Sequence, residues 1–241
     1  MYEFLFAEPA VDRQLLRAHA RAEVVRAPLL RACSDGDPAA VRALVQGAWP
    51  FVEAFEKAID LQVKRLPMRP LIARFGQVRM KHFFAQARAA VREMREEEGS
   101  HAALWRDSAD ELGVNLSCVK TVEAVRALLE GAEAADPVEF FCWLAGTEYI
   151  AEELAGYLCG SRAFVSSFRN GRWRWGEVHT RQHEGASHLE IDEDLARAYH
   201  PAGDPEVVGA ALSAWIRRCI RMFGASATDI MAYYLPATVA A

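Results

Sequence analysis

The segment at residues 92–113 places carboxylates and an imidazole where they could hold a metal ion together. It reads R-E-M-R-E-E-E-G-S-H-A-A-L-W-R-D-S-A-D-E-L-G. On a helix, Glu98 precedes His101 by three residues and Glu97 precedes it by four, so these side chains project from one face. Three consecutive glutamates beside arginines are also typical of a solvated helix face with weak ion pairs. The segment therefore indicates a metal site only if other parts of the chain supply further ligands.

A histidine-rich segment late in the chain is a second source of ligands. It reads W-G-E-V-H-T-R-Q-H-E-G-A-S-H-L-E-I-D-E-D-L and holds three of the seven histidines: His179, His183 and His188. On a continuous helix, Glu184, His188 and Asp192 share one face at spacings of four, whereas His179 faces roughly the opposite way. We therefore expect that the three histidines do not all reach one site on a regular helix.

Three glutamates interrupt an otherwise apolar helical run, A-G-T-E-Y-I-A-E-E-L-A, and form a third source. Glu148 and Glu152 lie one turn apart on a common face, and Glu153 follows. Charged residues in such a helix are rarely buried unless they are paired or bind metal. Glu152 or Glu153 could equally point to solvent or meet an arginine. This helix can therefore supply a carboxylate ligand, and the choice among the three stays open.

The elements that must position these residues are all predicted to be helices. Asp37, Asp136 and Asp204 each precede a proline, a helix-start signal because the carboxylate accepts from free N–H groups and the proline has no donor to lose. Pro28, Pro50, Gly76 and Gly99 mark positions for kinks or breaks, and Gly113 marks a C-terminal cap. Helical segments are expected at residues 11–33, 38–66, 70–112, 121–134, 137–160, 161–168, 173–199 and 205–234.

The absence of sustained two-residue alternation of β-branched residues argues against a sheet. We expect an all-α fold, a single-domain helical bundle of about seven to nine helices over residues 1–241. Apolar residues at helical spacing, such as Leu104, Trp105 and Leu112, predict that the segment at 92–113 packs against other helices.

Composition excludes several classes of function. Of the 241 residues, 52% are hydrophobic and 25% charged, which describes a globular protein and argues against extended disorder. A net charge of -5 argues against nucleic-acid binding, because such surfaces concentrate Lys and Arg. The sequence therefore favours a small-molecule substrate or a protein partner.

The start of the chain and the cysteines bear on location. The N-terminus, M-Y-E-F-L-F-A-E-P, lacks the basic region and long apolar run of an export signal, and no apolar segment reaches membrane-spanning length. We therefore expect a cytoplasmic protein with no membrane contact. The five cysteines are odd in number and form no C-x-x-C pair, which argues against a disulfide framework and a zinc site.

Several motifs, in order, resemble one known superfamily. They are A-P-L-L-R-A-C-S-D-G, then W-P-F-V-E-A-F, then E-E-E-G-S-H-A-A-L-W ending in D-E-L-G, then T-E-Y-I-A-E-E-L, and last the histidine-rich segment. The chain resembles the haem-oxygenase-like fold superfamily, in the branch that contains TenA-like thiaminases, pyrroloquinoline-quinone synthase and haem-oxygenase-like diiron oxidases. The resemblance is closest to the diiron oxidases and implies a haem-oxygenase-like bundle.

The resemblance also implies a set of metal ligands and catalytic residues. Carried over residue by residue, the diiron pattern falls on Glu98, His101, Glu152, His188 and Asp192.

One position departs from the diiron pattern. The third helix of the pattern has the form H-x-x-x-D-x-x-H, but residue 195 is Leu195, so a complete six-ligand site is in question. His179 and His183 remain substitutes if Gly185 breaks the helix and turns the earlier residues inward.

The resemblance implies an iron-dependent oxidase or oxygenase. Its cofactor would be Fe(II), as one or two ions, with manganese as the other metal, and its substrates would be dioxygen and a small organic molecule. Carboxylates and imidazoles are donors suited to these metals. Aromatic residues could shape an apolar pocket around the metal: Phe140, Phe141, Trp143 and Tyr149. Arg169, Arg172 and Arg174 could bind a substrate carboxylate, although exposure is the simpler expectation for them.

Two other readings stay open. TenA-like hydrolases pair a cysteine nucleophile with a glutamate and use no metal, and Cys142, near Tyr149 and Glu152 in the sequence, could act as that cysteine. The bundle could also have lost its chemistry and serve as a small-molecule-binding or partner-docking protein, which Leu195 would permit. Bundles of this kind often form homodimers, but the sequence identifies no contact face.

Overall fold

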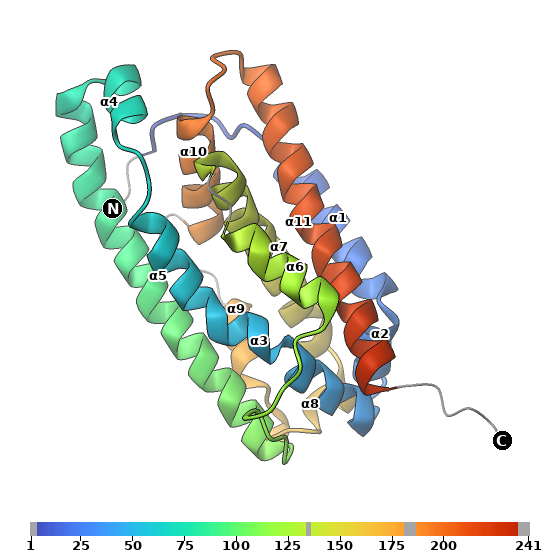
Figure 1. Ribbon diagram of the computed structural model, residues 1–241. Coiled ribbons are helices and arrows are strands. Elements are labelled where there is room, and N and C mark those ends of the chain that lie inside the picture. Colours follow the sequence, from blue (N-terminus) through green and yellow to red (C-terminus); the bar gives the residue numbers. More distant parts are fainter. Residues whose placement is uncertain (1–3, 134–135, 181–186, 236–241) are drawn as a thin grey trace.

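The computed structural model describes residues 4–133, 136–180 and 187–235, without the side chains of several residues between 87 and 98. In these ranges the chain forms α-helices and one short 3-10 helix, and no strand is found in them (Figure 1). The α-helices are α1 Arg13–Arg26, α2 Pro28–Ser34, α3 Pro38–Val63, α4 Arg69–Phe75, α5 Gln77–Glu111, α6 Glu123–Ala132, α7 Pro137–Cys159, α8 Arg162–Val165, α9 Arg174–His179, α10 His188–Tyr199 and α11 Pro205–Tyr234, and the 3-10 helix is η1 Arg169–Gly171. The all-α prediction is confirmed.

The three Asp–Pro start signals all begin helices as predicted. The side chain of Asp37 accepts from Ala39 N at 2.8 Å at the start of α3. Asp136 and Asp204 cap α7 and α11 in the same way, each accepting from the backbone two residues later. These local signals therefore fix where α3, α7 and α11 begin.

The described residues hold more helices than the seven to nine expected, because several predicted segments are divided. Pro28 opens α2 directly after α1, and Gly76, with φ +83°, separates α4 from α5. The expected helical segment at 173–199 comprises α9 and α10, and residues 181–186 between them lie outside the described ranges. By contrast, α3 continues through Pro50, and Gly99 lies inside α5 without breaking it.

Helix α7 is the centre of the bundle. It packs against α1, α9, α10 and α11, and most of its residues are buried. Figure 1 shows α7 between the long helices α5 and α11. The approach of α11 requires Gly146, because a Cβ there would lie 2.7 Å from Cys219 Cβ. A helix that is apolar all round belongs in a core, so the polar residues it carries must find partners there.

No helix among the described residues is both long and apolar enough to cross a membrane.

Candidate metal and substrate site

A carboxylate on the central helix faces imidazoles from three other helices. Oε1 of Glu148 on α7 lies 3.7 Å from Nδ1 of His188 at the start of α10, and both side chains are largely buried, 18% and 15% exposed. Burial raises the pKa of Glu148, but the interaction with His188 and the charges of His179 and His101 outweigh it, so the net shift is downward. Glu148 is therefore the electrostatic centre of a cluster with His101, His179 and His188, the histidine–glutamate cluster.

Two of the histidines contact each other. The rings of His101 on α5 and His179 at the end of α9 have centroids 4.3 Å apart. The His179 ring also lies against Trp175, with centroids 3.9 Å apart. Nδ1 of His179 is 2.8 Å from the Trp175 carbonyl oxygen, which can only accept. We therefore assign the hydrogen to Nδ1, which makes Nε2 the lone-pair nitrogen of the neutral ring.

The break between α9 and α10 explains why His179 and His188 reach the same cluster. The expectation that His179 faces away from His188 holds only for a continuous helix. Because α9 ends at His179 and α10 begins at His188, the two residues are positioned independently. His179 can therefore take the place of the ligand that is missing at Leu195. His183, Glu184 and Gly185 lie outside the described residues.

The residues implied by the diiron pattern are not all in the cluster. His101 and His188 are, and Asp192 lies one turn after His188 in α10, 1% exposed. Glu152 instead forms an ion pair with Arg17 of α1, with its side chain 29% exposed. The structure does not describe the side chains of Glu97 and Glu98. Leu195 is an apolar core residue, 5% exposed.

The sequence pattern offers Glu148 and His179 as candidates without selecting either. The signal that could have singled out Glu148 is its place after Ala145-Gly146-Thr147, small residues that let neighbouring helices approach closely. Among the side chains that the structure describes, no three His, Cys, Asp or Glu groups already converge at metal-holding distances.

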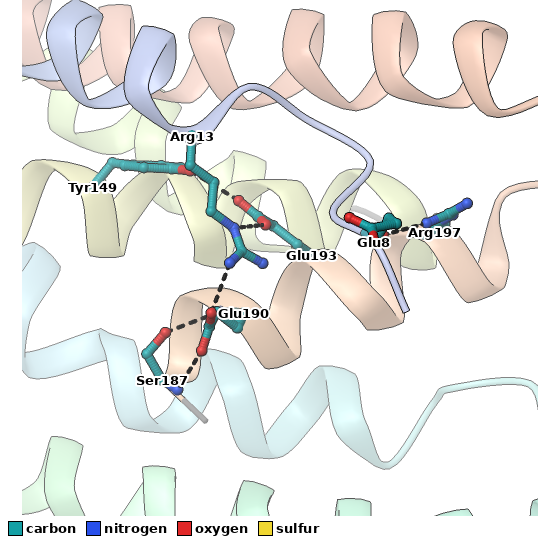
Figure 2. Close-up of polar contacts among 7 residues, drawn as sticks. All are labelled: Glu8, Arg13, Tyr149, Ser187, Glu190, Glu193 and Arg197. Atoms are coloured by element: carbon teal, nitrogen blue, oxygen red, sulfur yellow. Dashed lines mark hydrogen bonds and ion pairs between the residues drawn. The ribbon is translucent and has the colours of Figure 1, made fainter. Parts of the chain in front are cut away.

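A second polar network lies on α10 beside the cluster residues. Glu193, 3% exposed, accepts from Tyr149 OH at 2.9 Å and from Arg13 Nε at 2.7 Å (Figure 2). Arg13 also donates to Glu190 at 2.6 Å, and Glu190 and Ser187 exchange hydrogen bonds as a capping box. Burial raises the pKa of Glu193, opposed by Arg13 and Tyr149. This network fixes the first turn of α10, where His188 begins the helix.

The start of the chain is tied to the same helix. Asp194 accepts hydrogen bonds from Leu5 N and Phe6 N, at 3.0 and 3.2 Å. The guanidinium of Arg197 lies 4.0 Å from the centre of the Phe6 ring, and it donates to Glu8 O at 2.6 Å (Figure 2). Residues 4–8 therefore cover the face of α10 that carries Asp194 and Arg197.

Comparison with solved structures identifies the fold. A TenA homologue from Pseudomonas syringae pv. tomato str. DC3000 superposes with a TM-score of 0.70, over 95% of this chain and 98% of that one, at 16% sequence identity. The fold is TenA-like. This confirms the haem-oxygenase-like fold that the resemblance implied, and at this identity the likeness concerns the fold alone. No protein-family model and no curated protein matches the sequence.

Within this TenA-like bundle, Cys142 is poorly placed to act as a nucleophile. It is completely buried in α7, and burial raises its pKa well above the ordinary value, with further increases from Cys219 and Glu193. A reactive cysteine needs the opposite, a lowered pKa and access to solvent. The geometry therefore gives no support to a thiol mechanism at Cys142.

The three arginines considered as a substrate clamp are exposed. Arg172 forms a two-armed ion pair with Glu177, with Nε 2.7 Å from Oε1, and Arg174 lies 3.1 Å from Asp107. The backbone N–H of Arg169 donates to Glu111. The exposure expected for these arginines is confirmed, and the guanidinium groups of Arg172 and Arg174 are engaged by carboxylates.

Proposed function

We propose that this chain is a non-haem iron oxidase or oxygenase, with manganese as the alternative metal, that uses dioxygen to oxidise a small organic substrate. The observation that carries the proposal is Glu148, a largely buried carboxylate faced by imidazoles from α5, α9 and α10. When the imidazoles are neutral, as metal ligands must be, this buried carboxylate requires another counter-charge, and a divalent cation supplies one. The proposed ligands are His101, His179, His188 and Glu148, with Glu98 and Asp192 as further donors.

The chemistry of these donors fits iron. Imidazole and carboxylate together suit Fe(II) and Mn(II), whereas the absence of thiolate from the proposed set disfavours soft metals. The hydrogen bond from His179 Nδ1 to the Trp175 carbonyl is the arrangement that orients a metal-binding imidazole and raises its basicity. Side-chain rotations are needed before the donors converge on one ion.

The proposal replaces Glu152 with Glu148 as the carboxylate from α7. Glu152 already has a partner in Arg17, toward the outside of the bundle. Glu148 lies one turn earlier and faces the histidines. The assignment therefore follows the charges around each carboxylate rather than its position in the diiron pattern.

The chain's own residues prepare the site for oxidation chemistry. A bound ferrous ion would supply electrons and open coordination positions for dioxygen. Glu148 neutralises positive charge, and the Trp175 carbonyl holds the proton on Nδ1 of His179. Phe51, Phe55 and Trp175 line the pocket next to His101 and limit the access of water.

Metal binding tests the proposal directly. The purified chain is loaded anaerobically with ferrous iron and desalted, and its iron content is measured beside that of His101→Ala. We expect one or two equivalents in the parent chain and loss of iron in His101→Ala, with helical content preserved by circular dichroism. His82→Ala is the matched control, because His82 is an exposed histidine on the same helix, α5. Iron retention in His101→Ala, or equal loss in His82→Ala, would refute the assignment.

A further inference from the structure

An apolar cavity lies beside the histidine–glutamate cluster, lined mainly by α1, α3, α6, α7 and α11. Its volume is about 110 Å³. An apolar cavity of roughly 150 Å³ binds a single ring such as benzene, so this one has room for a short aliphatic chain or one ring. Five of its lining residues also line the pocket at His101 and Glu148: Phe51, Val52, Thr147, Ala151 and Trp175. The cavity and the cluster therefore share a wall.

The hydrogen-bonding groups on the cavity wall are already engaged by the protein. The hydroxyls of Thr147 and Ser226 donate to backbone carbonyls four residues earlier, at 3.0 and 2.9 Å. The indole N–H of Trp105 donates to Val45 O at 2.8 Å. A polar group of a ligand placed against these residues would lose water without gaining a partner. The wall therefore selects a ligand whose buried part is apolar.

Charge is confined to one part of the cavity. Among the described lining residues, Glu23 is the single ionisable one, and it is not among the five that border the cluster. Its carboxylate packs against α11 where Gly224 has no side chain, since a Cβ there would lie 2.5 Å from Glu23 Oε2. The part of the cavity next to the cluster is therefore uncharged.

Aromatic rings separate the cavity from the imidazoles. Trp175 lines the cavity, and its ring contacts His179 at 3.9 Å between centroids. Trp105 meets Trp175 nearly perpendicularly at 4.9 Å, which holds the indole in place. A molecule that touches Trp175 from the cavity side is therefore one ring away from His179.

We propose that this cavity binds the apolar body of the substrate, an aliphatic or aryl group without hydrogen-bonding atoms, against the wall that it shares with the histidine–glutamate cluster. That this ligand is the substrate rests on the proposed oxidase function. Binding of the apolar body does not require metal, so the two claims can fail separately.

Displacement of a neutral fluorescent probe tests the proposal. The chain is titrated with N-phenyl-1-naphthylamine, and the probe is then displaced with straight-chain 1-alkanols of increasing length. We expect saturable binding and an alkanol affinity that rises about fourfold for each added methylene until the cavity is full. Non-saturable binding, or alkanol affinities independent of chain length, would overturn the proposal.

Variants that fill the cavity locate the binding. Ala227→Leu places a larger side chain in the cavity from α11 and should weaken probe binding by about tenfold. Ala225→Leu is the control, because Ala225 is exposed on the same helix and does not line the cavity. Ala48→Leu repeats the test from α3, at a half-buried position, if Ala227→Leu does not fold. Unchanged probe affinity in a folded cavity variant would contradict the proposal.

Iron content measured on the same variants separates the two claims. Retained iron with weakened probe binding supports a cavity next to an intact metal site. Retained iron with unchanged probe binding rejects the cavity and leaves the oxidase proposal standing. Saturable, chain-length-dependent probe binding in a parent chain that holds no iron rejects the oxidase proposal and supports the cavity.

Discussion

The hydroxyl of Tyr149 donates a hydrogen bond of 2.9 Å to Oε1 of Glu193 and so joins the centre of α7 to α10. Tyr149 follows Glu148 in the sequence, and Glu193 follows Asp192. The same carboxylate is held by Arg13 from α1. Three helices are therefore fixed relative to one another immediately next to the proposed metal ligands.

Removal of the Arg13 charge should destabilise the bundle in a pH-dependent way. Arg13→Met leaves Glu193 buried without its cation. We expect this change to lower the free energy of unfolding by about 2–3 kcal/mol at neutral pH. The loss is smaller than for a fully buried pair because Arg13 is 30% exposed. Burial already raises the pKa of Glu193, and without Arg13 the pKa rises further. As pH falls through this raised pKa, Glu193 in the folded variant binds a proton that the unfolded chain lacks. The difference in the free energy of unfolding between the variant and the parent chain therefore shrinks.

Urea denaturation of Arg13→Met and the parent chain at several values between pH 5 and 8 checks this expectation. Arg17→Met is the control, because the Arg17–Glu152 pair is more exposed and should contribute about 1 kcal/mol or less. A deficit in Arg13→Met that grows on acidification would show that Glu193 is not the group responsible.

Glu148 and Glu152 should differ sharply in their effect on metal binding. Glu148→Gln keeps the shape of the side chain and removes the charge that the histidines face. We expect its ferrous-iron affinity to fall by more than the roughly 10–100-fold seen for outer-sphere partners. Glu152→Gln should leave the affinity unchanged. Anaerobic competition with a coloured iron chelator measures both, and the opposite ranking would favour the ligand set of the diiron pattern.

Cys142 should be inert toward alkylation in the folded chain. Its thiol is buried and its pKa is raised, whereas Cys118 is exposed. Iodoacetamide at pH 7.5, followed by peptide mass spectrometry, should label Cys118 first and reach Cys142 only after unfolding. Rapid labelling of Cys142 in the native chain would restore the metal-free hydrolase reading.

Local signals in the sequence predicted the helices well and their mutual orientation poorly. Asp37, Asp136 and Asp204 act on backbone groups two residues away, so their effect is visible in the sequence itself. Division of the chain at Gly76 also follows from a local requirement, a positive φ.

The choice between Glu148 and Glu152 depends on packing across the bundle. The two residues lie one turn apart on a helix that is apolar on nearly all sides, so no amphipathic pattern distinguishes the face toward α10 from the face toward α1. Arg13 and Glu193 are 180 residues apart in the chain. No periodicity connects such a pair, and only the assembled bundle brings it together.

The position of iron in a crystal is the decisive test of the proposed ligands. Crystals of the parent chain are soaked anaerobically in ferrous iron. Diffraction data are collected at the iron absorption edge, and an anomalous difference map is calculated from them. We predict a peak bounded by His101, His179, His188 and Glu148. No peak in fully soaked crystals, or a peak remote from Glu148, would contradict it.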